Sequence, residues 1–368
     1  MKLSMRKLLA LLTCVCLLIN VFAVSAFAAN PSIIIKDNDY YKVITQKNYA
    51  IAPGISEARI VLNDETGNNQ NMAYVMEVDL SNPYASVLPA YKDMDPYCDG
   101  TQGLSKMAKA AEEKLGVNVV GGTNIYLTWA NNIPVGVLVI NGKVYYNDTN
   151  TSYGYLAVTK DGKAEFRDGR TPLKGDEWQA ITVCSYIVKN GVSLYPTPDH
   201  ANANRAPRTT IGMKADGTLV MAVVDGRQAP TSVGMTMYEL AQMMLDLGCV
   251  TAFNCDGGGS STFISEREGS GELTIKNSPS DGVERPTLTS LLVISTATPS
   301  GVFDHANLSP NGDFYTPGSE IQFTAVGVDS AGGSAPLPAN IKWGLAAESS
   351  EMGSIDESTG LFTGYPGQ

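Results

Sequence analysis

The sequence predicts an α+β protein, in which a mixed or antiparallel β-sheet domain with a few helices is followed by a partial β-sandwich of the immunoglobulin-like (Ig-like) type. Short apolar segments separated by Gly, Asn and Pro recur along most of the chain, as in a sheet-rich domain. Only two segments have the apolar spacing of a well-defined helix. Beyond residue 298 the segments are small, polar and β-prone, which favours a sandwich. With 368 residues, 43% of them hydrophobic, the chain can bury a large core.

The two expected helices span residues 102–115 and 236–247. Gly116 ends the first, whereas Thr236 and Glu239 have the spacing of a capping box at the start of the second. Strands are expected at 33–35, 58–62, 73–80, 85–91, 117–120, 249–254 and 287–294, and hairpins around 141–142, 160–162, 190–191 and 216–217.

The chain divides into four expected parts: a signal peptide at 1–28, an N-terminal β-rich part of the catalytic region at 29–116, a main domain at 117–298 and an incomplete Ig-like module at 299–368. The last part has too few strands for a complete sandwich, so the chain is expected to stop within it.

Basic residues at the N-terminus precede an apolar stretch at 8–24, and Ala26-Phe27-Ala28 supplies the small residues of a cleavage site. A retained membrane anchor is the alternative, although the stretch is short for a span, and no later segment is long and apolar enough for one. We therefore expect a protein that is secreted or associated with the cell wall.

The net charge limits the expected binding partners, and the cysteine content limits the expected disulfide and zinc chemistry. The net charge is −11, and it becomes about −14 after loss of the signal, which carries Lys2, Arg6 and Lys7 and no acidic residue. Such a surface disfavours nucleic acid and anionic membranes. The four later cysteines permit either disulfides or buried free thiols, and their spacing fits no zinc site; they are Cys98, Cys184, Cys249 and Cys255.

A glycine-rich turn at 254–262 is the main candidate site. It contains Asn254, Asp256, Gly257, Gly258, Gly259, Ser260, Ser261 and Thr262. Consecutive glycines let a ligand approach the backbone, and their amides can form an anion-binding nest. A plain tight turn with capping hydroxyls is the alternative. The turn lacks the Lys of a P-loop and the G-x-S-x-G of a nucleophile elbow.

Four further segments carry candidate side chains. Arg208 lies within an expected strand, where its planar fork suits either a phosphate or a structural ion pair. The others follow strands or lie in polar loops; they are Asn124, Asp225, Arg227, Asn277, Glu284 and Arg285. Each segment by itself also fits an ordinary turn, bend or solvated loop.

The order and spacing of these segments resembles the phosphodiester glycosidase domain family over about residues 117–295. One departure from the family pattern is Cys255, where such domains usually have Leu. The other lies after Asn124, where residues 125–127 replace the small or acidic residue and the aromatics that the pattern would have. The tail beyond residue 300 resembles a fragment of a bacterial Ig-like module, which suggests a bacterial source.

This resemblance implies hydrolysis of the bond between a sugar anomeric carbon and a phosphodiester oxygen, in a carbohydrate or phosphodiester-linked glycan. We expect Asp256 to act as base or nucleophile, with Glu284 or Asp225 as the second carboxylate. Arg208, Arg285 and the glycine amides are expected to hold the phosphate, with Asn254 and Asn124 orienting sugar hydroxyls. Arg227, Asn277 and the turn hydroxyls complete the expected binding residues.

The sequence leaves alternatives for the cofactor and for the function. No cofactor is expected, but a divalent cation held by Asp225 or Asp256 is possible. A non-catalytic module that binds phosphodiester-containing wall or exopolysaccharide glycans is the alternative function. A serine hydrolase is disfavoured because His200 is the only imidazole in the expected domain.

Overall fold

The computed structural model describes residues 33–95, 100–126, 135–149, 151–198, 204–266, 271–310, 316–345 and 350–366. The expected signal peptide and Cys98 lie outside these residues. Within them, no helix combines the length and the apolar character needed to cross a membrane.

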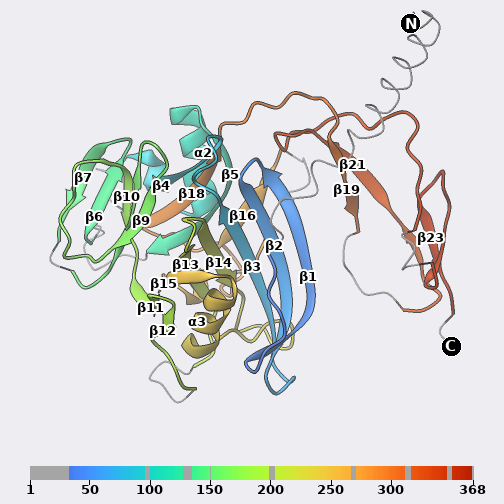
Figure 1. Ribbon diagram of the computed structural model, residues 1–368, viewed down its shortest axis with the longest axis horizontal. Helices are drawn as coiled ribbons and strands as arrows, with labels where there is room; N and C mark the ends of the chain where they lie inside the picture. The colour runs from blue at the N-terminus through green and yellow to red at the C-terminus, as the bar shows by residue number, and fades with distance from the viewer. Residues whose placement is uncertain are drawn as a thin grey trace, which may run out of the picture. The chain divides into compact units, whose positions relative to one another are not determined.

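An eight-stranded antiparallel sheet forms the centre of the molecule. In spatial order its strands are β1 (Tyr41–Ala52), β2 (Ile55–Asp64), β3 (Gln70–Val78), β14 (Leu219–Val224), β13 (Arg208–Lys214), β15 (Cys249–Asn254), β11 (Ser185–Lys189) and β12 (Val192–Ser193). Figure 1 shows β1, β2 and β3 continuing into the sheet of β14, β13 and β15. The residues expected as an N-terminal part thus share hydrogen bonds with the main domain.

Two five-stranded antiparallel sheets complete the domain. One has the order β17 (Leu273–Ile275), β16 (Phe263–Glu266), β5 (Asn118–Tyr126), β18 (Thr289–Ser295) and β4 (Ala85–Ala90). The other has the order β7 (Lys143–Asn147), β6 (Val137–Ile140), β10 (Glu177–Thr182), β8 (Tyr155–Thr159) and β9 (Ala164–Arg167). The expected fold class, an antiparallel sheet domain with few helices, is confirmed.

Each face of the large sheet covers an apolar core. One core lies against the second sheet and includes Met76, Phe253 and Phe263. The other lies under helix α3 (Met237–Asp246), which packs on β15 and β11 (Figure 1). Helix α2 (Leu104–Leu115) covers the second sheet, next to the short 3₁₀ turn η1 (Lys92–Met94).

Most expected elements are confirmed, including α3 with its Thr236–Glu239 capping box and the hairpin at Asn141-Gly142. The strand expected at 117–120 is longer, because β5 continues through Asn124 to Tyr126. Gly121 and Gly122 therefore lie inside a strand, and the alternative interpretation of this segment as a bend is wrong. A Cβ at Gly122 would lie 2.7 Å from the carbonyl oxygen of Leu291, so the close strand approach requires glycine there.

The C-terminal segment contains two small antiparallel sheets. One pairs β19 (His305–Ser309) with β21 (Thr324–Val328). The other has the order β20 (Glu320–Gln322), β23 (Leu361–Gly364) and β22 (Gly353–Ile355). The Ig-like assignment of this segment stays a prediction.

Candidate active site

The glycine-rich turn leaves the end of β15 in the middle of the large sheet. Its first amides are held by neighbouring strands: Cys255 N–H donates to the Thr209 carbonyl at 2.8 Å, and Asp256 N–H to the Ile125 carbonyl at 2.9 Å. Gly258 N–H donates to the Pro207 carbonyl at 2.9 Å, so this amide is already engaged within the protein. The turn thus has a fixed position between β13 and β5.

The three glycines meet different requirements. Gly258 has φ +65°, a conformation that other residues adopt at a cost. A Cβ at Gly257 would lie 2.7 Å from the Pro207 carbonyl oxygen. A Cβ at Gly259 would overlap the side chains of Arg285 and Asp281. Close packing therefore explains the glycines at 257 and 259, whereas the positive φ explains Gly258.

Two buried asparagines hold the turn from both sides. Asn124 Nδ2 donates to the Asp256 carbonyl at 2.7 Å, while its Oδ1 accepts from Thr262 N–H at 3.0 Å. Asn277 Oδ1 accepts from Phe263 N–H at 2.8 Å, and its Nδ2 donates to the Ser261 carbonyl at 3.0 Å. Both amides are therefore used to shape the site, which accounts for their presence without a substrate contact.

The turn hydroxyls are also buried and bonded within the protein. Ser260, Ser261 and Thr262 are each at most 1% exposed. The Ser261 hydroxyl lies 3.1 Å from that of Thr209, and Thr262 Oγ1 donates to the Ser260 carbonyl at 3.1 Å. The hydroxyls expected to bind substrate thus contribute to the rigidity of the turn.

Asp225 follows the last residue of β14 and is 2% exposed. Its Oδ1 accepts from Asn277 Nδ2 at 2.9 Å and from Ser278 N–H at 3.1 Å. Its Oδ2 lies 3.0 Å from the same Ser278 backbone nitrogen. Burial raises the pKa of Asp225 to about 6, although these donors and the Arg59 charge act to lower it. Asn277 thereby joins the Asp225 carboxyl to the glycine-rich turn.

Asp256 is the half-buried carboxyl of the turn itself. Burial raises its pKa, whereas a hydrogen bond from Ser260 and the charge of Arg285 lower it. Its Oδ2 atom is buried and has no hydrogen-bond partner among the described residues. An acceptor in this state gains from any donor that a substrate or water supplies.

The three expected arginines differ in how they are engaged. Arg208 Nε donates to the Met235 carbonyl at 2.9 Å and Nη2 to the Asn204 carbonyl at 2.7 Å, and it makes no salt bridge within the described residues. Arg227, with φ +60°, is exposed, and its guanidinium lies beside Gly258. Arg285 pairs with Asp281 at 2.6 Å, and its Nη1 lies 3.4 Å from Ser260 Oγ.

Glu284 and Asn254 are the two remaining expected site residues. Glu284 Oε1 accepts from Ser105 N–H at 2.8 Å, so its carboxylate meets the first turn of α2, which has no acidic residue of its own. A Cβ at Gly103 would lie 2.5 Å from Glu284 Oε2. Asn254 ends β15, and its Oδ1 is buried without a hydrogen-bond partner among the described residues.

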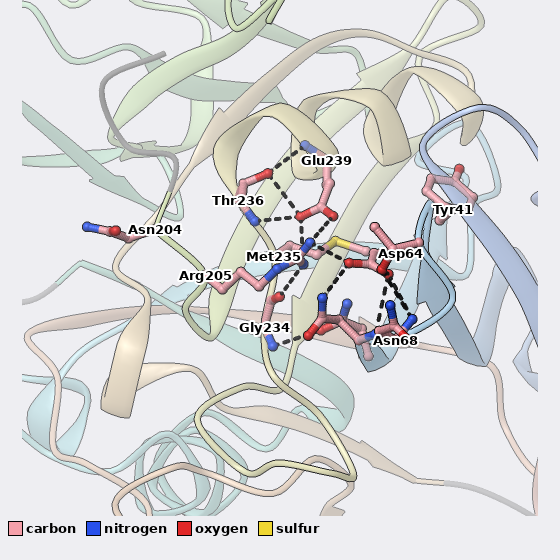
Figure 2. Close-up of polar contacts among 12 residues, drawn as sticks. Tyr41, Asp64, Asn68, Asn204, Arg205, Gly234, Met235, Thr236 and Glu239 are labelled. Atoms are coloured by element: carbon pink, nitrogen blue, oxygen red, sulfur yellow. Dashed lines mark hydrogen bonds and ion pairs between the residues drawn. The ribbon is translucent and has the colours of Figure 1, made fainter. Parts of the chain in front are cut away.

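Arg205, which the sequence analysis did not single out, anchors the segment that carries Arg208. Figure 2 shows its guanidinium between Asp64 and Glu239. Nη2 lies 3.0 Å from Asp64 Oδ2 and 2.7 Å from Glu239 Oε1, while Nη1 donates to the Gly234 carbonyl at 3.1 Å. Asp64 is 141 residues away in sequence, so no local pattern could reveal this contact.

No group of three or more His, Cys, Asp or Glu side chains that could hold a metal ion occurs in the described part of the chain. Cys184, Cys249 and Cys255 are free thiols. Burial raises the pKa of Cys255 to about 12, which keeps this thiol neutral near pH 7.

Comparisons with known proteins show which family this part of the chain resembles. The model of the phosphodiester glycosidase family matches residues 113–294. The uncharacterized protein YomE, derived from the SPbeta prophage of Bacillus subtilis (strain 168), is 30% identical over an alignment of 218 residues that covers 55% of this chain and 32% of that protein. N-acetylglucosamine-1-phosphodiester alpha-N-acetylglucosaminidase of Bos taurus is 36% identical over an alignment of 101 residues that covers 23% of this chain and 19% of that enzyme.

The solved catalytic domain of the zebrafish N-acetylglucosamine-1-phosphodiester alpha-N-acetylglucosaminidase, auto-inhibited by its pro-peptide, has a similar fold. The match has a TM-score of 0.50 at 19% identity and covers 69% of this chain and 89% of that domain. The chain spans about a third and about a fifth of the lengths of its two curated relatives. Residues 113–294 belong to the phosphodiester glycosidase family.

Proposed function

We propose that this domain hydrolyses a sugar-1-phosphodiester at the bond between the sugar C1 atom and the phosphodiester oxygen, releasing a free sugar and a phosphomonoester. The observation that carries the proposal is the joining of two shielded carboxyls, Asp225 and Asp256, through Asn277 and the glycine-rich turn. Both carboxyls have raised pKa values, as is typical of groups that exchange protons or stabilise charge in a reaction.

Asp256 is the proposed base for water or the nucleophile at C1. Its Oδ2 atom needs a donor that the described residues do not provide, which an incoming water would supply. Its raised pKa makes its carboxylate more basic than an ordinary one.

Asp225 is the proposed second carboxylate, in preference to Glu284. Because its two oxygens accept from Asn277 and Ser278, its ionised form is oriented in one direction. A fixed negative charge of this kind stabilises an oxocarbenium-like centre at the sugar. Glu284 is engaged with α2 and is proposed here as a structural residue.

Arg285 and Arg227 are the proposed phosphate contacts, since one guanidinium lies near Ser260 and the other beside Gly258. The leaving group is a phosphomonoester whose second pKa is about 6, so its departure needs little help from an acid. Holding the phosphate and stabilising the sugar cation are then the main tasks of the site. We further propose that the protein acts outside the cell, on glycans that contain phosphodiesters.

A panel of sugar-1-phosphodiesters tests this function. The purified protein is expected to release free sugar and phosphomonoester from at least one member, with and without a chelator. Asp256→Asn serves as the inactive comparison, and Glu284→Gln as an active one. Binding of the panel without any release would support the non-catalytic module instead, and release abolished by chelator would assign a role to a divalent cation.

A further inference from the structure

Cys184 and Cys255 occupy opposed positions on neighbouring strands at the start of the glycine-rich turn. In the antiparallel register of β11 and β15, Ser185 pairs with Asn254. The next step of the same register brings Cys184 opposite Cys255, directly before each strand continues into its loop. The two residues are therefore cross-strand neighbours, and both thiols are free in the structure.

The hydrogen bonds of β15 determine which kind of cross-strand pair this is. Cys255 N–H donates to the Thr209 carbonyl of β13 at 2.8 Å, so the backbone polar groups of Cys255 point away from β11. A residue of a central antiparallel strand that bonds to one neighbouring strand forms a non-hydrogen-bonded pair with the other. The Cα atoms of such a pair lie about 4.5 Å apart, within the range of about 4.4–6.8 Å that a disulfide spans.

The adjacent aromatic pair shows to which face the two thiols point. The rings of Tyr186 and Phe253, which are partners in the same register, lie with their centroids 4.1 Å apart. Side chains alternate between the two faces along a strand, so Cys184 and Cys255, each two residues away, share the face of these rings. Phe253 and Cys255 both belong to the core that lies against the second sheet.

Direct contacts join the pair to each other and to the backbone of Asp256. Burial raises the pKa of Cys255, and a hydrogen bond from the Cys184 backbone amide opposes this effect, so the Cys255 sulfur touches Cys184. The Cys184 Sγ atom lies 3.9 Å from the Ile125 carbonyl oxygen. The same carbonyl accepts from Asp256 N–H at 2.9 Å. A covalent change at this pair therefore acts on the backbone that carries Asp256.

We propose that Cys184 and Cys255 form a cross-strand disulfide under oxidising conditions, which joins β11 to the start of the glycine-rich turn. The oxidant is a small-molecule disulfide. The thiolate of Cys184, which is the more exposed of the two residues, attacks it and releases one thiol. Cys255 then attacks the Cys184 sulfur and releases the second thiol. Two electrons and two protons thus pass from the two cysteines to the oxidant.

The bond is expected to stabilise the fold. It closes the loop from residue 184 to residue 255 and so limits the conformations of the unfolded chain. The sheet already holds the two cysteines as partners, so the native state needs little rearrangement. We expect the melting temperature of the oxidised protein to exceed that of the reduced protein by about 5–10 °C.

Disulfide mapping tests the bond. The purified protein is refolded from its reduced, denatured state in glutathione buffers of increasing oxidised fraction, so that burial in the native state does not limit access to the thiols. Free thiols are then alkylated, and the peptides are identified by mass spectrometry. We expect a peptide that links Cys184 to Cys255. Cys249→Ser is the matched control and should form the same bond, since Cys249 lies on the same strand but belongs to the other core.

Cys184→Ser and Cys255→Ser should each lose the linked peptide and the rise in melting temperature on oxidation. Alkylation of both cysteines at the most oxidising ratio would overturn the inference, and so would a dominant bond from either one to Cys98 or Cys249. A linked peptide without a higher melting temperature would contradict the stabilising role. If a serine variant does not fold, the wild type with and without reductant gives the same comparison.

Amide hydrogen exchange tests the connection to the glycine-rich turn. Exchange at the Asp256 amide should slow several-fold in the oxidised protein, because the preceding residue is then tied to β11 as well as to β13. Equal exchange rates in the two redox states would contradict this effect on the site. None of these measurements depends on hydrolysis, so the disulfide and the proposed function stand or fail separately.

Discussion

Asp225 and Asp256 lie in one hydrogen-bonded site but differ in how their carboxyls are held. Asp225 is 2% exposed, and both of its oxygens accept hydrogen bonds from the loop at Asn277 and Ser278. Asp256 is half-buried, and its Oδ2 has no partner among the described residues. A carboxyl with fixed bonds suits charge stabilisation, and one with an unused acceptor suits a direct reaction with water or sugar.

The first test of this difference is Asp256→Asn. Because the amide is neither a base nor a nucleophile, we expect kcat to fall by roughly 10²–10⁴-fold, the usual contribution of such a group. Steady-state rates on a sugar-1-phosphodiester measure the loss. A variant with nearly normal turnover would remove Asp256 from the reaction.

Asp225→Asn should lower kcat by a smaller factor, on the order of 10²-fold, because it removes a stabilising charge and leaves the proposed reacting group in place. The wild type should lose activity as the pH falls through about 6, since the raised pKa keeps Asp225 protonated below that value. The residual activity of Asp225→Asn should not show this fall near pH 6, because the group that titrates there is absent. Rates measured from pH 4 to 8 check both statements.

Gly259→Ala tests the packing of the turn against Arg285 and Asp281, which a Cβ would overlap. We expect KM to rise by about tenfold as Arg285 is displaced, which corresponds to about 1.4 kcal/mol of binding free energy. Gly344→Ala is the control, since that glycine has no neighbour within 4 Å of a Cβ and no positive φ. Equal KM values in the two variants would argue against a phosphate contact by Arg285.

The smallest expected effect on catalysis is that of Glu284→Ala. Loss of the bond to Ser105 N–H should lower the free energy of unfolding by about 0.5–2 kcal/mol, as for other helix N-terminal contacts. The kcat value at a temperature where the variant is folded should stay close to that of the wild type. Denaturant unfolding and steady-state kinetics measure the two quantities, and a large fall in kcat would return Glu284 to the list of catalytic residues.

Local sequence signals predicted the frame of the site well. The strand 249–254, the turn that follows it and the Thr236–Glu239 capping box depend on neighbouring residues, and the structure has all three. The strand through Asn124 was underestimated, because Gly121-Gly122 has low strand propensity and only its packing against β18 and Met76 explains it.

Contacts between distant residues account for what the sequence did not reveal. Glu284, one of the two residues expected as the second carboxylate, has a hydrogen-bond partner 179 residues away, at the start of α2. Arg205 gave no signal, because Asp64 and Glu239 meet it only in the folded chain. Such long-range partners follow from sheet topology, which a single sequence does not specify.

Hydrolysis in ¹⁸O-labelled water tests the central claim most directly. Cleavage at the sugar C1–O bond leaves both bridging oxygens of the original diester on phosphorus, and the labelled oxygen of water goes to the sugar. The ³¹P NMR spectrum of the released phosphomonoester should therefore show no ¹⁸O isotope shift. A labelled phosphomonoester would mean attack at phosphorus and would contradict the roles given to Asp225 and Asp256.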